Sequence, residues 1–189
     1  MSKRVLVVTG DGGDSYEAMY ACQRLREARW EPVVAAPSRR RLHMVIHDLD
    51  PAWETYVERE GHSVDADVAI TAVAAKEFAA AVLLGGRAPE YLRNDPSLLS
   101  LMREFAEHDR FLCAIGHGIQ ILIAAGLIEG RTVTCHPHVR IEVERGGGTY
   151  SSKSAVRDGK LITAQTWKCH AEFYQEVIAA LSETASTAR

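Results

Sequence analysis

Short apolar runs alternate along this chain with segments whose apolar residues fall at helical spacing. The apolar runs are continuous, as is typical of strands that are buried on both faces of a parallel sheet. In the helical segments the apolar positions share one face, as Met19, Cys22 and Leu25 do. The predicted strands are RVLVVTG (4–10), EPVVAAP (31–37), VAITAV (68–73), FAAAVLL (78–84) and FLCAI (111–115), and the predicted helices span 16–30, 96–109 and 120–125.

The regular exchange of strands and helices predicts βαβ units, in which parallel strands form one sheet and helices cover both of its faces. We therefore expect an α/β fold, a three-layer α/β/α sandwich of flavodoxin-like type with a mainly parallel sheet. A chain of 189 residues with 47% hydrophobic residues can bury a sizeable core without disulfides. We expect a single domain over residues 1–189.

Two regions interrupt this alternation. Residues 43–62 are rich in charged and aromatic side chains, and they are predicted to form a strand pair or another excursion from the alternating pattern. Between residues 132 and 166 the runs RTVTC, YSSKSAVRDG and KLITAQT alternate like antiparallel strands around the turns GGG and RDGK. The fold should therefore carry a small antiparallel excursion.

The composition argues against several classes of partner. The net charge is -3 and no basic cluster exceeds the short RRR at 39–41, so we expect no nucleic-acid binding. No apolar run approaches the ~20 residues of a membrane-spanning helix, and the N-terminus shows no cleavage signal. These features predict a cytoplasmic protein without a membrane partner.

The spacing of cysteine and histidine gives no sign of a metal site. The four cysteines form no CxxC pair, and they fit reduced thiols better than a disulfide framework. The segment CHPH (135–138) matches no standard zinc pattern. The glycine-rich loop TGDGGDS (9–15) lacks both GxGxxG and the GK[ST] ending, which argues against a dinucleotide cofactor.

The segment FLCAIGHGIQIL (111–122) is the most informative motif. Ligands of open α/β sheets bind beyond the carboxyl ends of the strands, where this segment passes from strand to helix. Such a turn needs small neighbours, because the residue at its tip has a strained backbone and projects its side chain into the pocket. Here the tip residue is Gly116, which relieves the strain and supplies no nucleophile.

At this point the chain resembles a known family. AIGHGIQIL (114–122) resembles the AICHGPQIL segment of the ThiJ/PfpI superfamily, the class I glutamine amidotransferase-like group. LLGGRAPEYL (83–92) resembles the family's LPGGRAPE segment, and TGDGGDSYEAM (9–19) resembles its first-strand loop. The resemblance extends from Arg4 to about Leu181. It implies a homodimer or hexamer that works without a cofactor, and it puts Gly116 at the position of the nucleophilic cysteine.

The resemblance also implies roles for individual side chains. Glu17 matches the acidic residue that hydrogen-bonds the nucleophile in relatives. His117 matches the histidine next to the nucleophile, which a glutamate of a neighbouring subunit orients, and Glu90 would be that glutamate. His136 matches a histidine that lines the pocket of deglycase-like members.

The backbone N–H groups near Gly85, Gly86 and His117 match the family's oxyanion hole. An oxyanion hole is a set of hydrogen-bond donors that stabilises negative charge developing on a substrate oxygen. Because this one is made of backbone, it survives the loss of the nucleophile.

Three further residues are candidates for the pocket wall. Cys135 lies in a loop that is expected near the pocket, and Trp167 follows the last predicted strand. Trp53, together with Tyr56, belongs to the excursion and is expected either in the pocket wall or in a subunit contact. Cys135 could also replace the missing nucleophile, although a reactive thiol needs a base and an oxyanion hole that are aligned with it.

The chemistry that remains for Glu17 and a histidine is proton transfer. A carboxyl group in a partly dry pocket has its pKa raised toward neutrality, which suits a general acid or base. We therefore predict hydration, elimination or enolisation of a small carbonyl-containing metabolite, carried out by Glu17 with His117 or His136 and the backbone oxyanion hole.

Two alternatives stay open from the sequence. Loss of the thiol alone would give a non-catalytic protein, which binds a small ligand or stabilises a partner. A cysteine hydrolase, hydratase or glyoxalase whose nucleophile was replaced by engineering would also carry glycine at position 116.

Overall fold

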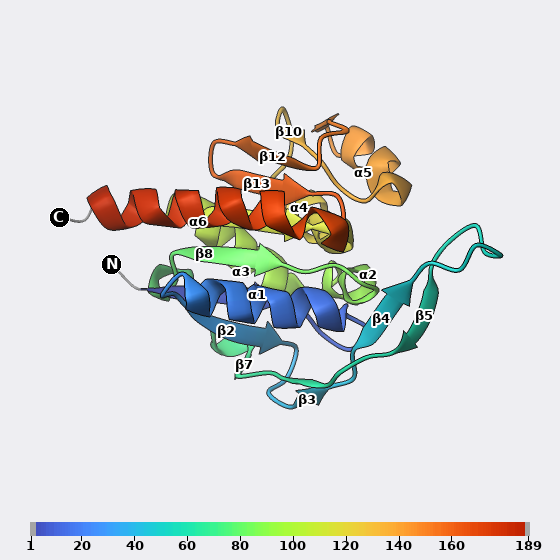
Figure 1. Ribbon diagram of the computed structural model, residues 1–189. Coiled ribbons are helices and arrows are strands. Elements are labelled where there is room, and N and C mark those ends of the chain that lie inside the picture. The colour runs from blue at the N-terminus through green and yellow to red at the C-terminus, as the bar shows by residue number, and fades with distance from the viewer. Residues whose placement is uncertain (1–2, 188–189) are drawn as a thin grey trace.

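A seven-stranded sheet forms the centre of the computed structural model, which describes residues 3–187 (Figure 1). Neighbouring strands are parallel except at one edge, where β12 and β13 are antiparallel. This arrangement confirms the mainly parallel α/β fold. The strands lie in the order β12 (Ala155–Asp158), β13 (Leu161–Ala164), β9 (Phe111–Ile115), β8 (Ala80–Leu83), β1 (Arg4–Val8), β2 (Glu31–Ala36) and β7 (Val68–Ala69).

Strand β1 explains why its sequence is apolar without interruption. Val5 and Val7 belong to one hydrophobic core cluster, whereas Leu6 and Val8 belong to the other. Successive side chains of a strand point to opposite faces of the sheet. A strand that is covered on both faces therefore needs an apolar residue at every position.

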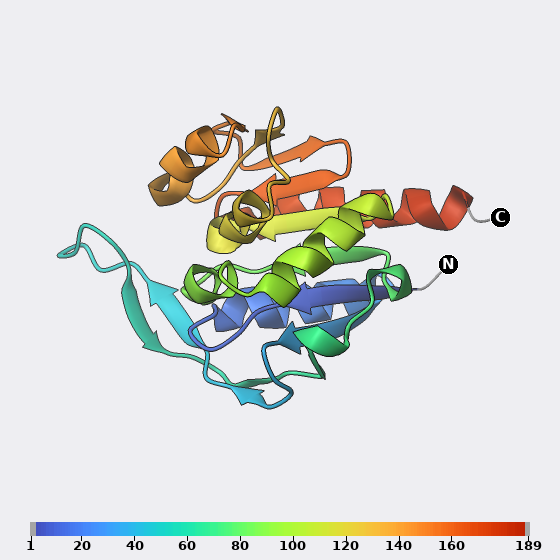
Figure 2. The same cartoon turned by 180° about the vertical axis from the view of Figure 1, so that it is seen from behind.

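Helices cover both faces of the sheet and complete the three layers (Figures 1 and 2). Phe173 and Leu25 pack from the helices of one face into the first core cluster, and Phe105 packs from the other face into the second. The helices of the first face are α1 (Ser15–Glu27) and α6 (His170–Thr187), and those of the second face are α2 (Ala88–Leu92), α3 (Pro96–Glu107) and α4 (Ile119–Ala124).

Capping residues determine where α1 and α3 begin. The carboxylate of Asp14 accepts the N–H of Glu17 at 3.0 Å, and that of Asp95 accepts the N–H of Ser97 at 2.8 Å. Each bond satisfies an N–H that has no partner inside the first turn. α1 ends earlier than its sequence pattern predicts, because Arg29 has a φ of 64° and left-handed backbone cannot continue the helix.

The predicted strand pair within residues 43–62 is present as a hairpin, which projects on the right of Figure 1. β4 (Val45–Asp48) pairs antiparallel with β5 (Val57–Glu60). At the base of the hairpin β3 (Arg41–Leu42) and β6 (Val64–Asp65) pair in the same way.

Main-chain hydrogen bonds attach this hairpin to the sheet. The N–H of Val45 donates to the carbonyl oxygen of Gly13 at 2.9 Å, and the N–H of Gly12 donates to that of His43 at 2.8 Å. The N–H of Arg87 donates to the carbonyl oxygen of Gly12, also at 2.8 Å. The hairpin and the loops after β1 and β8 thus meet at the carboxyl ends of the strands, where ligand sites of such sheets lie.

The strand predicted over residues 68–73 is correct only for its first two residues and is wrong for residues 70–73. Only Val68 and Ala69 pair with β2. The chain then turns into the 3₁₀ segment η1 (Ile70–Ala72), in which the N–H of Val73 bonds back to the carbonyl oxygen of Ile70 at 3.2 Å. An apolar run alone cannot separate these two conformations, because both bury Ile70.

The antiparallel pairing predicted between residues 132 and 166 is half correct. β12 and β13 form the expected hairpin around Gly159, whose φ is 60°. β10 (Thr132–Val133) and β11 (Thr149–Tyr150), however, are parallel. The reason is the helical crossover between them, because parallel strands need a crossover connection rather than a tight turn. That crossover contains η4 (Pro137–Val139) and α5 (Arg140–Arg145).

The remaining short 3₁₀ segments are η2 (Ala75–Glu77), η3 (Gly116–Gly118) and η5 (Trp167–Cys169). Helices α2, α5 and α6 were not assigned from the sequence pattern. Among residues 3–187, no helix is both long enough and apolar enough to cross a bilayer.

We expect Phe105→Ala to lower the free energy of unfolding by about 3–5 kcal/mol, because the fully buried ring packs where α3 covers the sheet. Glu107→Ala, on the exposed side of the same helix, is the control and should change it by less than about 0.5 kcal/mol. Urea unfolding followed by circular dichroism measures both. Equal losses in the two variants would contradict the buried face of α3.

Candidate active site

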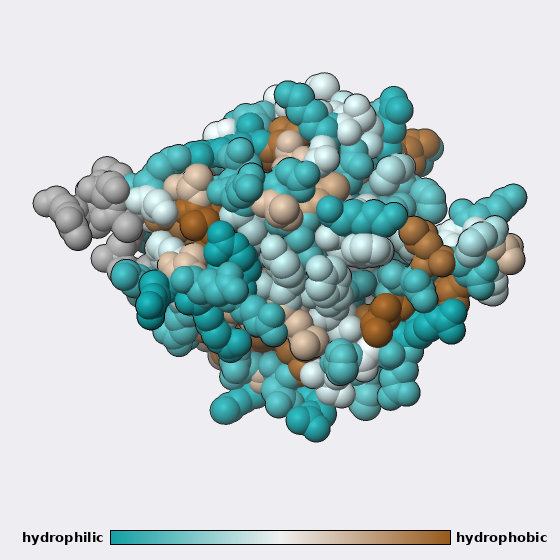
Figure 3. All heavy atoms as spheres, in the orientation of Figure 1, coloured by the Kyte–Doolittle hydropathy of each residue, from teal (hydrophilic) through white to brown (hydrophobic). Residues whose placement is uncertain are grey.

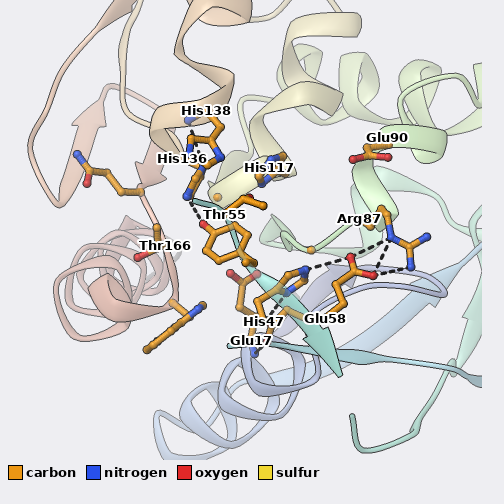
Figure 4. Close-up of a pocket in the computed structure, with 16 residues that line it drawn as sticks. Glu17, His47, Thr55, Glu58, Arg87, Glu90, His117, His136, His138 and Thr166 are labelled. Carbon is orange, nitrogen blue, oxygen red and sulfur yellow. Dashed lines mark hydrogen bonds and ion pairs between the residues drawn. The ribbon is translucent and has the colours of Figure 1, made fainter. Parts of the chain in front are cut away.

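A cavity of about 260 Å³ opens where the loops after β1, β8 and β9 meet the hairpin (Figure 4). Glu17, His117 and His136, which come from different segments of the chain, all line it. Gly86, Glu90 and Trp167 line it as well. The fold therefore brings most of the side chains singled out in the sequence to one place.

Glu17 lies in the first turn of α1, and its side chain is removed from water although it is ionisable. The residue is only 3% exposed, and its Oε2 accepts the N–H of Gly85 at 2.6 Å. Burial, and then the charge of Asp14, raise the pKa of Glu17 well above 4.5, while the bond from Gly85 opposes the shift. Glu17 can thus hold a proton at a pH where an exposed glutamate is ionised.

The bend after β9 has the unusual backbone conformation that the sequence predicts for its tip residue. Gly116 has a φ of +59°, in the left-handed region that side chains rarely adopt. A Cβ atom built at this position would lie 3.7 Å from Oε1 of Glu17 and 3.7 Å from the carbonyl oxygen of Gln165. A side chain at position 116 would therefore point at the carboxyl group of Glu17 without a clash.

Two histidines stack at the cavity. The rings of His117 and His136 have centroids 5.1 Å apart and planes inclined by 19°. Burial, reinforced by neighbouring histidines, lowers the pKa of each to about 4. Both rings are therefore neutral at physiological pH.

Hydrogen bonds fix the ring of His136. Its Nδ1 accepts the backbone N–H of His138 at 3.2 Å. Its Nε2 is hydrogen-bonded to the hydroxyl of Tyr56, which the hairpin brings into the cavity. The sequence allowed Tyr56 either in the pocket wall or in a subunit contact, and the structure gives it a polar partner in the cavity.

A row of charged groups that the sequence did not reveal forms another wall of the cavity (Figure 4). Nδ1 of His47 lies 2.8 Å from Asp14 and Nε2 lies 3.4 Å from Glu58. Arg87 in turn donates to both carboxylate oxygens of Glu58, from Nη2 to Oε2 at 2.9 Å and from Nε to Oε1 at 2.9 Å and to Oε2 at 3.1 Å. These four side chains alternate in charge along the wall.

The charge of His47 follows from its two neighbours. Burial is the largest single effect on this ring and opposes protonation, but hydrogen bonds and charges of Asp14 and Glu58 together raise the pKa of His47. A sequence signal did exist, since alternation in β4 puts Val45 and His47 on the more buried side of the strand. No local sequence pattern, however, predicts that Asp14 lies beside His47.

Two residues predicted in the pocket wall lie elsewhere. Cys135 is fully buried in the second core cluster, and burial raises its thiol pKa to about 12, so it is neither at the cavity nor reactive. Trp53 is 59% exposed in the segment that joins β4 and β5 and does not line the cavity, so of its two expected locations the subunit contact stays a prediction. The loop assignments were sound, but the directions of the two side chains depend on tertiary packing.

The predicted oxyanion hole needs one correction. The N–H of Gly85 donates to Glu17, so it is not offered to the cavity. Gly86 and His117 do line the cavity. Glu90 lines it too, and its expected role toward a histidine of a neighbouring subunit stays a prediction. Within residues 3–187 no group of three His, Cys, Asp or Glu side chains has the arrangement of a metal site.

Comparisons with known proteins agree with this geometry. The model of the DJ-1/PfpI family matches residues 3–180. Protein DJ-1 homolog D of Arabidopsis thaliana is 33% identical in an alignment of 187 residues that covers 95% of this chain and 48% of that protein. A deglycase of Thermococcus kodakarensis is 30% identical over 162 residues, which are 86% of this chain and 89% of that protein.

Solved structures give the same result. A two-domain protein of Anabaena variabilis, with DJ-1/ThiJ/PfpI-like and ferritin-like domains, superposes with a TM-score of 0.86 at 26% identity. The match covers 96% of this chain and 48% of that one. The chain thus spans about half the length of the Arabidopsis relative and of the two-domain structure.

Gly116→Ala and Gly118→Ala should differ in stability. At position 116 the new Cβ meets nothing closer than 3.7 Å, so only the positive φ is unfavourable and the free energy of unfolding should fall by about 1 kcal/mol. At position 118 the Cβ would lie 2.3 Å from the carbonyl oxygen of Leu83, which should lower it by about 3 kcal/mol. Thermal and urea unfolding test the order, and a reversed order would refute the described turn.

Glu17→Gln should become more stable than the wild type as pH rises. Because the folded pKa of Glu17 is raised, the stability it contributes is full below the unfolded value of 4.5 and is lost as pH rises through the folded pKa. Glutamine does not titrate. Urea unfolding from about pH 4 to about pH 9 measures the difference between the two proteins. A wild type that gains stability over the variant with rising pH would mean that the site favours the carboxylate.

Proposed function

Because the chain belongs to the DJ-1/PfpI family, we propose that it is an enzyme of that family which moves protons on a small carbonyl-containing compound without a cysteine nucleophile. One observation carries the proposal. The buried carboxyl group of Glu17, whose pKa is raised, faces the bend at Gly116, where a side chain would otherwise lie. In this proposal Glu17 is the proton carrier, and Gly116 stands where the family resemblance puts the nucleophile.

Glu17 is the group that exchanges a proton with substrate carbon. In its ionised form it removes a proton from the carbon next to the carbonyl, and the electron pair of that C–H bond moves toward the carbonyl oxygen. The protonated form returns the proton to the substrate. A carboxyl group with its pKa near the working pH performs both steps best.

The oxygen that gains negative charge needs hydrogen-bond donors. Gly116 and His117 begin the η3 segment, and the first N–H groups of a helical segment have no acceptor inside it. Fixed N–H groups of this kind stabilise developing negative charge without rearranging. The neutral ring of His117 can polarise the same oxygen, as a neutral imidazole does in other proton-transfer enzymes.

The volume of the cavity limits the size of the proposed substrate. A volume of about 260 Å³ lies below the usual range of pockets for drug-sized ligands, which favours a compound of few atoms. Hydration, elimination and enolisation all suit such a carbonyl compound. The name deglycase of the Thermococcus relative also points to carbonyl chemistry.

The proposal is tested with a panel of small aldehydes, ketones and 1,2-dicarbonyl compounds that includes methylglyoxal. Glu17→Gln should reduce kcat/KM by about 1000-fold, because the proton carrier is lost while its volume is kept. Cys135→Ala is the matched control and should stay within about twofold of the wild type, since the thiol is buried away from the cavity.

Three results would contradict or redirect the proposal. Activity that survives Glu17→Gln would remove its central residue, and activity that disappears in Cys135→Ala would favour covalent catalysis. A wild type inert toward the whole panel would favour a non-catalytic ligand-binding protein. Gly116→Cys is informative as well, because a reactive thiol and new hydrolase activity there would point to an engineered cysteine enzyme.

A further inference from the structure

Tyr56 has a location that distinguishes it from the rest of its loop. Residues 51–55, which precede it between β4 and β5, are exposed, whereas Tyr56 is partly buried and lines the cavity. Its ring contacts His47 edge-on at a centroid distance of 5.4 Å and His136 at 5.1 Å. Thr55 also lines the cavity, but of the two hydroxyl groups that the hairpin brings to the site, the one of Tyr56 is hydrogen-bonded to His136.

The protonation of His136 can be read from its backbone contact. Nδ1 of His136 lies 3.2 Å from the amide nitrogen of His138. A backbone amide only donates, so Nδ1 must present its lone pair. A neutral imidazole carries one proton, which is therefore on Nε2.

That tautomer decides the direction of the next hydrogen bond. Nε2–H of His136 donates to the hydroxyl oxygen of Tyr56. The hydroxyl accepts this bond and still has its own proton to give. In the part of the chain that the structure describes, the Tyr56 hydroxyl makes no other hydrogen bond.

The hydroxyl keeps this proton at physiological pH. Burial is the main cause that raises the pKa of Tyr56 to about 12, and the nearby charges of Glu17 and Asp14 add to it. Glu17 and Tyr56 both line the cavity, so the hydroxyl and the carboxyl group can reach the same ligand. A neutral hydroxyl with a free proton is a hydrogen-bond donor for a substrate oxygen.

We propose that Tyr56 is a further catalytic residue, whose hydroxyl donates a hydrogen bond to the carbonyl oxygen of the substrate, and that His136 is its positioning residue. This inference rests on the proposed function, because it adds a donor to the oxygen that gains charge there. The proton stays on Tyr56 throughout, and the hydrogen bond strengthens as the electron pair moves onto the oxygen. His136, which the sequence suggested as a proton carrier, instead holds the donor in place.

The tautomer can be tested without a substrate. Long-range ¹H–¹⁵N correlation spectra of the histidine side chains should show His136 protonated at Nε2 and unprotonated at Nδ1. A proton on Nδ1 would mean that Tyr56 donates to His136, which overturns the inference whatever the enzyme does. The same spectrum of Tyr56→Phe should show the same tautomer, because the amide of His138 sets it.

Kinetics test the role of the hydroxyl. With the panel compound that the wild type converts fastest, Tyr56→Phe should lower kcat by about 100-fold and change KM by less than about threefold. The ring contacts are kept, so the melting temperature should not fall. Tyr150→Phe is the control, since this ring packs beneath Arg140 outside the cavity, and it should behave as the wild type does.

The outcomes separate this inference from the proposed function. Loss of activity in both Tyr56→Phe and Glu17→Gln supports both. An inactive Glu17→Gln beside a fully active Tyr56→Phe overturns the inference alone. A fully active Glu17→Gln, or a wild type that converts no compound of the panel, overturns both.

Discussion

The carboxyl group of Glu17 is buried against the main chain of the loop after β8, and the site is organised around that contact. The bond from the Gly85 N–H compensates only part of the cost of burying an ionisable group, so the pKa of Glu17 rises. The carboxyl lies in the first turn of α1, whose N-terminus is fixed by Asp14. The close packing of the start of α1 against the loop after β8 therefore determines both where the Glu17 carboxyl group lies and why its pKa is raised.

Asp14 has a second role because it has two carboxylate oxygens. Oδ1 caps α1, while Oδ2 binds the ring of His47 from the hairpin. The same residue thus couples α1, which carries Glu17, to the hairpin that brings Tyr56 into the cavity. A change at Asp14 would act on the helix end, on the charge of His47 and on the pKa of Glu17 at once.

The sequence could predict those parts of the fold that are determined by the pattern of neighbouring residues. Continuous apolar runs such as 4–10 and 111–115 lie in the central strands, and GHG after the run at 111–115 marks the bend. His117 lies in the turn after β9 and Glu17 at the start of the helix after β1, so parallel topology brings both to the carboxyl ends of the strands. The strand pair within 43–62 could also be predicted, because alternation and turn residues mark it.

The features that the sequence could not predict depend on packing between segments that are far apart in the chain. His47 meets Glu58 through the register of β4 with β5, which no short motif encodes. Cys135 was expected at the cavity because its loop passes nearby, yet its side chain points into the core. The parallel pairing of β10 with β11 could not be seen either, since it depends on a helical crossover whose helix, α5, is only six residues long.

Glycine at position 116 has a further consequence for the proposed site, because it supplies no sulfur atom there. No cysteine or methionine lines the cavity within the described chain, and the four cysteines are all buried. Oxidants such as peroxide attack exposed thiolates first, and a nucleophilic cysteine at such a bend is a common target. A site made of carboxyl, imidazole, hydroxyl and amide groups has no such target, so the proposed proton transfer would not require reducing surroundings.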